Sequence, residues 1–206
     1  MADREFQVKP LFAEPYFVTS LADVITPKQV EFLKSLEMVD NQVNKISKNL
    51  YIFEEPALRG IAKAVQEALD IYAREVMGIV QKLHVTQSWT LTNPPGIGMH
   101  GHSHSNSLVS GSLYYTDLPD PPASMIFERH TSYQLLELGP NRGQPNVYNA
   151  TRNSVVPKKG DLVMFPSKLQ HYVEANTSML PRHSVAFNSF VRGKIGSFRD
   201  VSELKL

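Results

Sequence analysis

The chain has 206 residues, of which 42% are hydrophobic and 20% charged, a globular balance that excludes a disordered chain as the default. Its 21 Lys and Arg residues against 20 Asp and Glu residues give a net charge of +1 with no block of like charge, which argues against a nucleic-acid partner. Cysteine is absent, which excludes disulfides and cysteine-bound zinc, and no apolar run approaches the roughly 18 residues of a membrane span.

Two helices are predicted in the first half of the chain. The first lies in residues 26–37, where Thr26 is a suitable N-cap, Pro27 takes the first helical position and Gln29 completes a capping box. The second runs from Ala57 to Leu83 without a proline, and its apolar residues follow the i, i+3, i+4, i+7 spacing. Such a stripe needs an apolar surface to cover.

Short strands are predicted after Leu83. The segments are rich in Val, Thr, Phe and Tyr and are separated by Pro, Gly, Asn and Asp; they span residues 85–93, 110–117, 123–129, 160–167, 170–175 and 182–191. No amphipathic helix intervenes, so the strands should be antiparallel, in a sandwich or barrel. The polar segment Gly139–Val155 is predicted to be a long loop.

These elements predict one α+β domain over residues 1–206. Residues 1–84 would supply an N-terminal strand and helical support, residues 85–195 the β core, and residues 196–206 a C-terminal tail. The second helix would cover the sheet with its apolar stripe, which is why a single domain is favoured over two.

Histidines at alternate positions mark the stretch "GMHGHSHSNS". In an extended segment His100, His102 and His104 project from the same face, a spacing that lets two imidazoles meet at one metal ion. Isolated histidines at a strand end are more often simply exposed. Here, however, a further histidine, His171, follows an apolar strand and a Pro-Ser turn. An HxH pair with a distal histidine is a set of ligands that suits non-haem Fe(II).

An arginine accompanies this set. In "RHSVAFNSF", Arg182 shares one face with Ser184, Ala186 and Asn188 by the period of two. An arginine on the inner face of a β core is costly unless it meets an anion, and a ligand carboxylate held in a bidentate fork would supply that anion.

The segments "TNPPGIGMHGHSHSNSLVSGSLYYTD" and "VVPKKGDLVMFPSKLQHYVEANTSMLPRHSVAFN" resemble the 2-oxoglutarate and Fe(II)-dependent oxygenases of the type found in phages and marine bacteria. That family's pattern is NPPG, then HxHxNSxLSGxxYY, then GxLxxFPSxLxHxV, then RxSxxFN. The likeness covers roughly residues 86–192. It implies a double-stranded β-helix, which is a jelly roll, with Fe(II) as cofactor and 2-oxoglutarate as cosubstrate.

The resemblance also implies roles for individual residues. His102 would be the first iron ligand and His171 the distal one. Arg182 would bind the far carboxylate of 2-oxoglutarate, and Tyr115 matches a tyrosine that helps to hold that carboxylate in related prolyl hydroxylases. Asn188 and Asn93 are weaker candidates for the cosubstrate pocket, and Trp89, Thr90 and Thr92 are either lining residues or ordinary strand residues.

His104 stands where the wider superfamily has a carboxylate ligand. Three neutral histidines would leave the charge of Fe(II) uncompensated by a ligand anion. Two alternatives stay open: His104 and Asn106 form the pair, or two histidines bind and water completes the shell. His102 with His104 is favoured because the residues after His104 leave room for a hairpin turn. His100, His84, His130 and His183 are expected to be outer or structural residues.

The predicted function is therefore an Fe(II)- and 2-oxoglutarate-dependent dioxygenase that hydroxylates an unknown substrate and releases succinate and CO2. The alternatives are a cupin-type metalloenzyme that does not use 2-oxoglutarate and would not need Arg182 or Tyr115, and a non-enzymatic jelly-roll binding or structural module. The expected partners are a small-molecule cosubstrate and an unknown substrate, either a small molecule or a protein side chain, without nucleic acid or membrane; a homodimer is left open. The opening residues lack a signal peptide, so we expect the cytoplasm, that of the host if the chain is phage-encoded.

Overall fold

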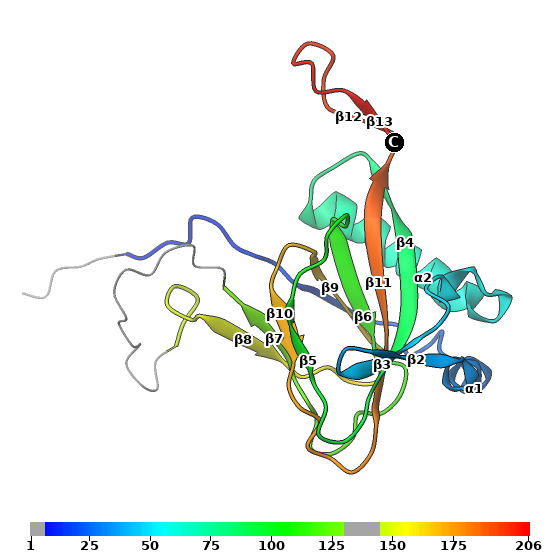
Figure 1. Cartoon of the computed structure of the whole chain (residues 1–206). Helices are drawn as coiled ribbons and strands as arrows, with labels where there is room; N and C mark the ends of the chain where they lie inside the picture. The colour runs from blue at the N-terminus through cyan, green and yellow to red at the C-terminus, as the bar shows by residue number, and fades with distance from the viewer. Residues whose placement is uncertain (1–6, 130–144) are drawn as a thin grey trace, which may run out of the picture.

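Two facing β-sheets form the core of the protein, whose computed structural model describes residues 7–129 and 145–206 (Figure 1). The larger sheet has seven strands in the order β1-β9-β6-β11-β4-β3-β2, and the smaller has four in the order β5-β10-β7-β8. All pairs between these strands are antiparallel, as predicted. The strands of the larger sheet are β1 (Phe17–Ser20), β2 (Met38–Asn41), β3 (Asn44–Ser47), β4 (Lys82–Asn93), β6 (Val109–Leu113), β9 (Asp161–Pro166) and β11 (Arg182–Arg192), and those of the smaller are β5 (Met99–His102), β7 (Met125–Glu128), β8 (Arg152–Val155) and β10 (His171–Val173).

The N-terminal half supplies the predicted N-terminal strand, β1, and also a β2–β3 hairpin that the sequence did not predict. Its strand β1 pairs with β9, and the β2–β3 hairpin joins the sheet through β4. The hairpin turns at Gln42, whose φ is 52°. Short strands of this kind are set by pairing partners elsewhere in the chain, so their own sequence predicts them poorly.

Helix α1 (Pro27–Ser35) begins as predicted. The Thr26 side chain accepts a hydrogen bond from the Gln29 backbone N–H at 3.3 Å, and the Gln29 side chain accepts one from the Thr26 backbone N–H at 2.8 Å. The two bonds form the predicted capping box, and the Gln29 N–H also donates to the Thr26 carbonyl at 3.0 Å.

The second helix is shorter than predicted. Two 3₁₀ turns, Ile52–Glu54 and Pro56–Leu58, lead into α2 (Arg59–Ile71), and a π-helical turn, Tyr72–Val76, ends it. Gly78 then adopts a left-handed φ of 63°, a common way for a helix to stop, and Leu83 already belongs to β4. None of the helices within residues 7–129 and 145–206 is long and apolar enough to cross a membrane.

Two apolar layers lie on opposite sides of the larger sheet. Helix α2 packs against one face, where Ile61, Val65 and Leu69 are fully buried in one cluster with Val185 and Phe187 of β11. The other face meets the smaller sheet through a second cluster, made by Tyr114, Met125, Phe127, Val163 and Phe165. The predicted α+β class, with helices covering a β core, is confirmed.

The segment predicted as a long loop contains a strand. Residues 139–144 of it lie outside the described residues, as does His130, but Arg152–Val155 forms β8 and pairs with β7 from Met125 to Glu128. Its sequence, Arg-Asn-Ser-Val, has little of the β-branched and aromatic character that predicts a strand. Pairing with the open edge of β7 therefore decides its conformation.

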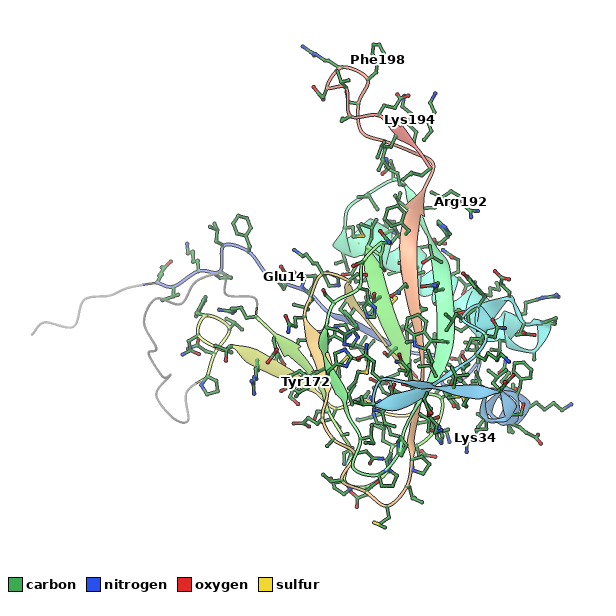
Figure 2. The ribbon with its side chains drawn as sticks, viewed as in Figure 1. Glu14, Lys34, Tyr172, Arg192, Lys194 and Phe198 are labelled. Carbon is green, nitrogen blue, oxygen red and sulfur yellow. The ribbon has the colours of Figure 1, made fainter. Side chains whose placement is uncertain are left out.

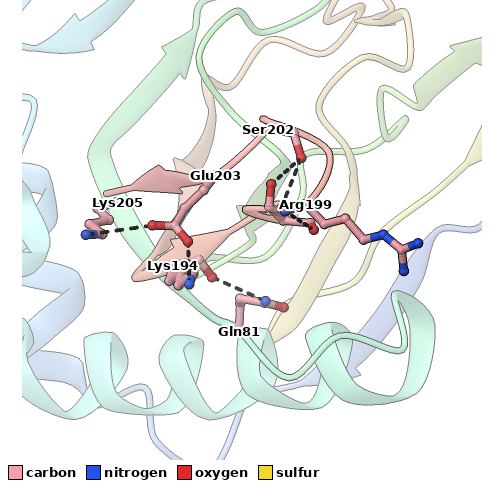
Figure 3. A network of polar contacts seen from close by, with 7 residues as sticks. Gln81, Lys194, Arg199, Ser202, Glu203 and Lys205 are labelled. Atoms are coloured by element: carbon pink, nitrogen blue, oxygen red, sulfur yellow. Dashed lines mark hydrogen bonds and ion pairs between the residues drawn. The ribbon is translucent and has the colours of Figure 1, made fainter.

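The end of the chain is a hairpin rather than a plain tail, made by β12 (Lys194–Ile195) and β13 (Leu204–Lys205). It extends beyond the end of β11, and Figure 2 shows Phe198 near its far end. Figure 3 shows how the hairpin is held together: Glu203 forms ion pairs with Lys194 and Lys205, and the Gln81 side chain donates to the Lys194 carbonyl at 3.4 Å. How the chain divides into domains stays a prediction.

Candidate functional site

Three histidines converge where the smaller sheet faces the larger one. His171 of β10 pairs directly with His102 of β5 in antiparallel register, and their ring centroids are 4.4 Å apart. The ring centroid of His104 lies 4.9 Å from that of His102 and 5.2 Å from that of His171. One ring nitrogen from each of the three lies within 4.8 Å of the others, a spacing that suits one metal ion. We call these residues the histidine triad.

The route by which His104 reaches this point differs from the prediction. Strand β5 ends at His102, so the two histidines do not share a strand. Beyond β5 the His104 N–H donates to the Ser167 carbonyl at 2.9 Å, which ties this segment to the turn after β9. Asn106 then makes the turn with a left-handed φ of 55° and is exposed, whereas His104 lines the cavity described below.

Backbone carbonyls fix the tautomers of two triad members. The Nδ1 atom of His102 lies 2.8 Å from the His100 carbonyl, and that of His171 lies 2.9 Å from the Leu169 carbonyl. Since a carbonyl only accepts, each Nδ1 carries the proton, and each Nε2 keeps a lone pair for a metal. His100 itself is exposed and contributes its backbone, in line with the expected outer role.

Burial keeps the triad uncharged. It lowers the pKa of His104 to about 4 and that of His171 to about 3, with neighbouring histidines contributing further in both cases. The pKa of His102 is also lowered, chiefly by burial. Phe165 packs edge-on against His171, with ring centroids 4.5 Å apart. Neutral imidazoles are the form that binds a metal, so a metal need not displace protons at neutral pH.

These shifts predict an acid-sensitive protein in the absence of metal. Between about pH 6.5 and pH 4 the unfolded chain protonates His104 and His171 while the folded chain does not. The free energy of unfolding should therefore fall as the pH falls through this window, by up to about 1.4 kcal/mol per pH unit for each histidine. Urea unfolding of chelator-treated protein at several pH values checks this. The variant His171→Gln should show a shallower dependence, and an equal slope in both proteins would contradict the prediction.

The triad borders a cavity of about 290 Å³ between the two sheets. Alternate residues of β4 line it, namely Gln87, Trp89, Leu91 and Asn93, as the period of two requires. On β11 the alternate residues Arg182, Ser184 and Ala186 line it together with Phe187, which also belongs to the apolar cluster with α2. Thr90 and Thr92 of β4 do not line it; their hydroxyls contact Tyr115 and His183 instead. None of the described residues that line the cavity is acidic.

Arg182 is buried in this cavity without an anion. Arg182 is only 2% exposed, and none of the ion pairs among the described residues includes it. One guanidinium NH2 donates to the Tyr114 hydroxyl at 3.1 Å, while Nε has no hydrogen-bond partner. A buried cation with an unused donor is costly unless a ligand completes it.

The tyrosine that contacts the arginine is Tyr114, whereas the sequence had pointed to Tyr115. The Tyr115 hydroxyl lies 3.3 Å from Thr90 Oγ1, and its ring belongs to the apolar cluster under α2. Counting by twos from Ser110 and Ser112, which line the cavity, leads to Tyr114. The period of two was therefore the signal that could have found it.

The two asparagines also differ in placement. Asn93 lines the cavity and is 1% exposed, but its amide donates to the Gly98 carbonyl at 2.8 Å and so also holds the following loop. Asn188 is not among the lining residues; it accepts a hydrogen bond from Ser110 at 2.9 Å. The pairing of β11 with β4 shifts by one residue between Asn188 and Ser189 and then continues to Arg192.

Residues 87–188 match the model of a protein family described as "Putative 2OG-Fe(II) oxygenase". No curated protein matches the chain in sequence. Among solved structures, the chain is similar to the non-haem alpha-ketoglutarate-dependent epimerase SnoN from nogalamycin biosynthesis, with 15% identity, a TM-score of 0.62, and coverage of 86% of this chain and 76% of that one.

Two further structures show the same likeness. HygX from Streptomyces hygroscopicus, with nickel, 2-oxoglutarate and hygromycin B bound, has 16% identity and a TM-score of 0.59, covering 85% of this chain and 82% of its own. A prolyl-4-hydroxylase from Pseudomonas putida has 14% identity and a TM-score of 0.58, covering 87% and 92%. At these identities the likeness concerns the fold, and it confirms the predicted double-stranded β-helix.

Proposed function

We propose that the chain is a 2OG-Fe(II) oxygenase, the family whose model residues 87–188 match, and that it hydroxylates a small or protein-borne substrate with 2-oxoglutarate as cosubstrate. The histidine triad would hold Fe(II), and Arg182 would bind 2-oxoglutarate. The observation that carries this proposal is that a three-nitrogen donor set and an arginine lacking an anion line the same cavity.

The donor chemistry of the triad fits Fe(II). Imidazole nitrogen suits this ion, and three ligands leave coordination positions free for a cosubstrate. Because no acidic residue lines the cavity among the described residues, the charge of the metal would be balanced by the cosubstrate rather than by a ligand carboxylate. When bound together, Fe(II) and 2-oxoglutarate supply oxygen activation, which converts 2-oxoglutarate to succinate and CO2 while one oxygen atom enters the substrate.

The surroundings of Arg182 fit a carboxylate. The free Nε donor together with the guanidinium NH2 groups can form a fork with the two oxygens of the far carboxylate of 2-oxoglutarate. The Tyr114 hydroxyl, which already accepts from Arg182, holds the guanidinium in place and keeps its own proton to donate. We therefore transfer to Tyr114 the role first assigned to Tyr115, and keep Asn93 as a lining residue.

These residues divide the work of the reaction. The triad orients the metal on the side of β5 and β10, and Arg182, at the start of β11, anchors the cosubstrate from the larger sheet. The apolar walls, which include Leu91, Met125 and Phe165, keep water from the cavity.

Succinate release from 2-oxoglutarate tests the proposal. The protein, purified anaerobically and loaded with one Fe(II) per chain, is given 2-oxoglutarate and then oxygen, and succinate is measured with and without candidate substrates. We expect succinate in amounts that exceed the enzyme. If the protein binds iron but yields no succinate under any condition, the cupin-type alternative is favoured; if it binds no iron, the non-enzymatic alternative is.

The setting of this activity follows from the sequence. We propose a small-molecule cosubstrate and a small or protein-borne substrate as partners, and no nucleic acid, because the net charge is +1 without a basic stripe. We also propose a cytoplasmic location and leave the homodimer open.

Variants of His104 test which residue completes the metal shell. His104→Asp should still bind Fe(II), because a carboxylate is a ligand that this metal accepts and the short side chain starts from the same backbone position. His104→Ala should weaken binding while His102 and His171 remain. Asn106→Gly, which removes the amide and suits the left-handed φ, should leave binding unchanged. Anaerobic Fe(II) titration measures all three, and weaker binding in Asn106→Gly would instead support the His104–Asn106 pair.

A further inference from the structure

A buried cluster of small polar side chains lies directly behind His104. Ser167 Oγ is 2.7 Å from Ser107 Oγ and 2.8 Å from Ser110 Oγ, and Ser110 Oγ donates to Asn188 Oδ1 at 2.9 Å. Ser110, Ser167 and Asn188 are 1%, 0% and 8% exposed. These four residues, Ser107, Ser110, Ser167 and Asn188, are called the serine hub below.

The serine hub joins four separate parts of the chain. Ser107 follows the turn after His104, Ser110 lies on β6, Ser167 follows β9, and Asn188 lies on β11. The Ser107 hydroxyl also donates to the Ser189 carbonyl at 3.1 Å. All four residues fall inside the sequence motifs quoted above, yet only Ser110 lines the cavity, so binding of cosubstrate does not account for the set.

Ser167 connects the hub to the triad. Its carbonyl accepts the His104 N–H at 2.9 Å, and its own N–H donates to the Leu108 carbonyl at 3.0 Å. The same short turn leads on to His171, because Leu169 N–H donates to the Pro166 carbonyl at 2.9 Å and the Leu169 carbonyl accepts from His171 Nδ1. Ser167 therefore lies between the segments that carry His104 and His171.

His104 depends on this connection more than its partners do. His102 lies within β5 and His171 within β10, and the rings of both are held by carbonyls. His104 lies beyond the end of β5, and among the described residues no hydrogen bond holds its ring. Its backbone bond to Ser167 is therefore what fixes its distance from the other two histidines.

We propose that the serine hub positions His104 as the third metal ligand, by fixing the Ser167 backbone between His104 and the turn to His171. Its residues are positioning residues: they act through His104 and do not contact the metal. The inference rests on the proposed function, since it gives the triad its metal. It also gives Asn188, first considered for the cosubstrate pocket, a role as acceptor for Ser110.

Loss of the Ser167 hydroxyl should disturb the hub as a whole. In Ser167→Ala, both Ser107 and Ser110 lose a hydroxyl partner in a buried site, and the cheapest relief is a shift of the Ser167 turn. A shift of a few tenths of an ångström is transmitted to His104 through its backbone bond. Outer partners of metal ligands typically contribute about 10- to 100-fold to metal affinity.

A matched control is available on β11. Ser189 is 0% exposed, and its hydroxyl donates to the Val109 carbonyl at 2.6 Å, an acceptor that it shares with the Ser107 hydroxyl at 3.3 Å. The bonds of the Ser189 backbone to Ser107 remain in Ser189→Ala. This variant therefore removes one buried serine hydroxyl, as Ser167→Ala does, while the contacts of Ser167 with Ser107, Ser110 and the His104 N–H stay in place. The midpoint of thermal unfolding, measured on the metal-free variants, shows how much stability each substitution removes.

Cobalt(II) binding is the measurement, because it reports both affinity and ligand number. The only tryptophan of the chain, Trp89, has its ring centroid 6.4 Å from that of His104, so its fluorescence should be quenched when Co(II) binds. We expect Ser167→Ala to raise the dissociation constant about 10- to 100-fold and to change the visible absorption of bound Co(II), as loss of a ligand does. Ser189→Ala should do neither, although both variants lose similar thermal stability.

Equal dissociation constants and spectra for Ser167→Ala and Ser189→Ala would overturn the inference. Should Ser167→Ala fail to fold, Ser110→Ala takes its place, because Ser110 bridges Ser167 and Asn188 and its loss should shift Co(II) affinity in the same direction. If the unmodified protein binds neither Co(II) nor Fe(II), the proposed function itself fails, which is a different result from a metal site that is indifferent to the hub.

Discussion

His171→Ala should abolish tight binding of Fe(II). The residue is 4% exposed, and its Nε2 is one of three nitrogens that meet within 4.8 Å, so no other described side chain can replace it. The loss should exceed the roughly 10- to 100-fold that removal of an outer partner costs, because a direct ligand is removed. Anaerobic titration gives the affinity, and the visible charge-transfer band of bound Fe(II) and 2-oxoglutarate should disappear. His102→Ala should behave in the same way.

His100→Ala is the matched control for these variants. It removes an imidazole from the same stretch of chain, but His100 is exposed and is not among the three residues whose ring nitrogens meet. Its backbone carbonyl, which holds His102 Nδ1, remains in the variant, and only the ring contact with His102, at 5.4 Å between centroids, is lost. Iron binding should therefore persist. If His171→Ala and His102→Ala bind iron as well as the unmodified protein does, the triad is not the metal site.

The sequence predicted the fold class and the convergence of the three histidines for physical reasons. Alternation placed His102 on the inner face of its strand, and antiparallel strands separated by short turns bring distant segments together. His104 reaches the site although β5 ends at His102, because its backbone bond to Ser167 ties this segment to the turn after β9. Whether the triad binds a metal stays a prediction.

Other features depend on contacts that no local pattern records. The apolar spacing of helix α2 continues beyond Ile71 in the sequence, but Gly78 ends the helical conformation and Val80 is 94% exposed. Glycine was a visible stop signal that the periodicity concealed. The serine hub had no such signal, because single serines at strand ends are ordinary in sequence and acquire a common role only when β6, β9 and β11 pair.

Arg182→Ala should weaken binding of 2-oxoglutarate by about 2–4 kcal/mol, or about 30- to 900-fold, with little effect on Fe(II) affinity. The change removes a bidentate, charge-assisted contact and leaves the cosubstrate carboxylate partly buried without a partner. Arg182→Lys should recover part of the loss, because it restores the charge but not the planar fork. Titration of 2-oxoglutarate into the Fe(II)-loaded variants, followed by the charge-transfer band, measures each constant.

The neighbouring tyrosines separate this binding role from a role in folding. Tyr114→Phe removes the hydroxyl that accepts from Arg182, and should cost about 0.5–1.5 kcal/mol of 2-oxoglutarate binding. Tyr115→Phe removes a hydroxyl that contacts only Thr90 on the helix side of the sheet, and should leave 2-oxoglutarate binding unchanged. The reverse order would restore Tyr115 to the site. Equal losses of Fe(II) and 2-oxoglutarate affinity in Arg182→Ala would mean that this arginine supports the fold instead of binding the cosubstrate. An arginine that only binds the cosubstrate carboxylate should leave the affinity of the three histidines for Fe(II) unchanged.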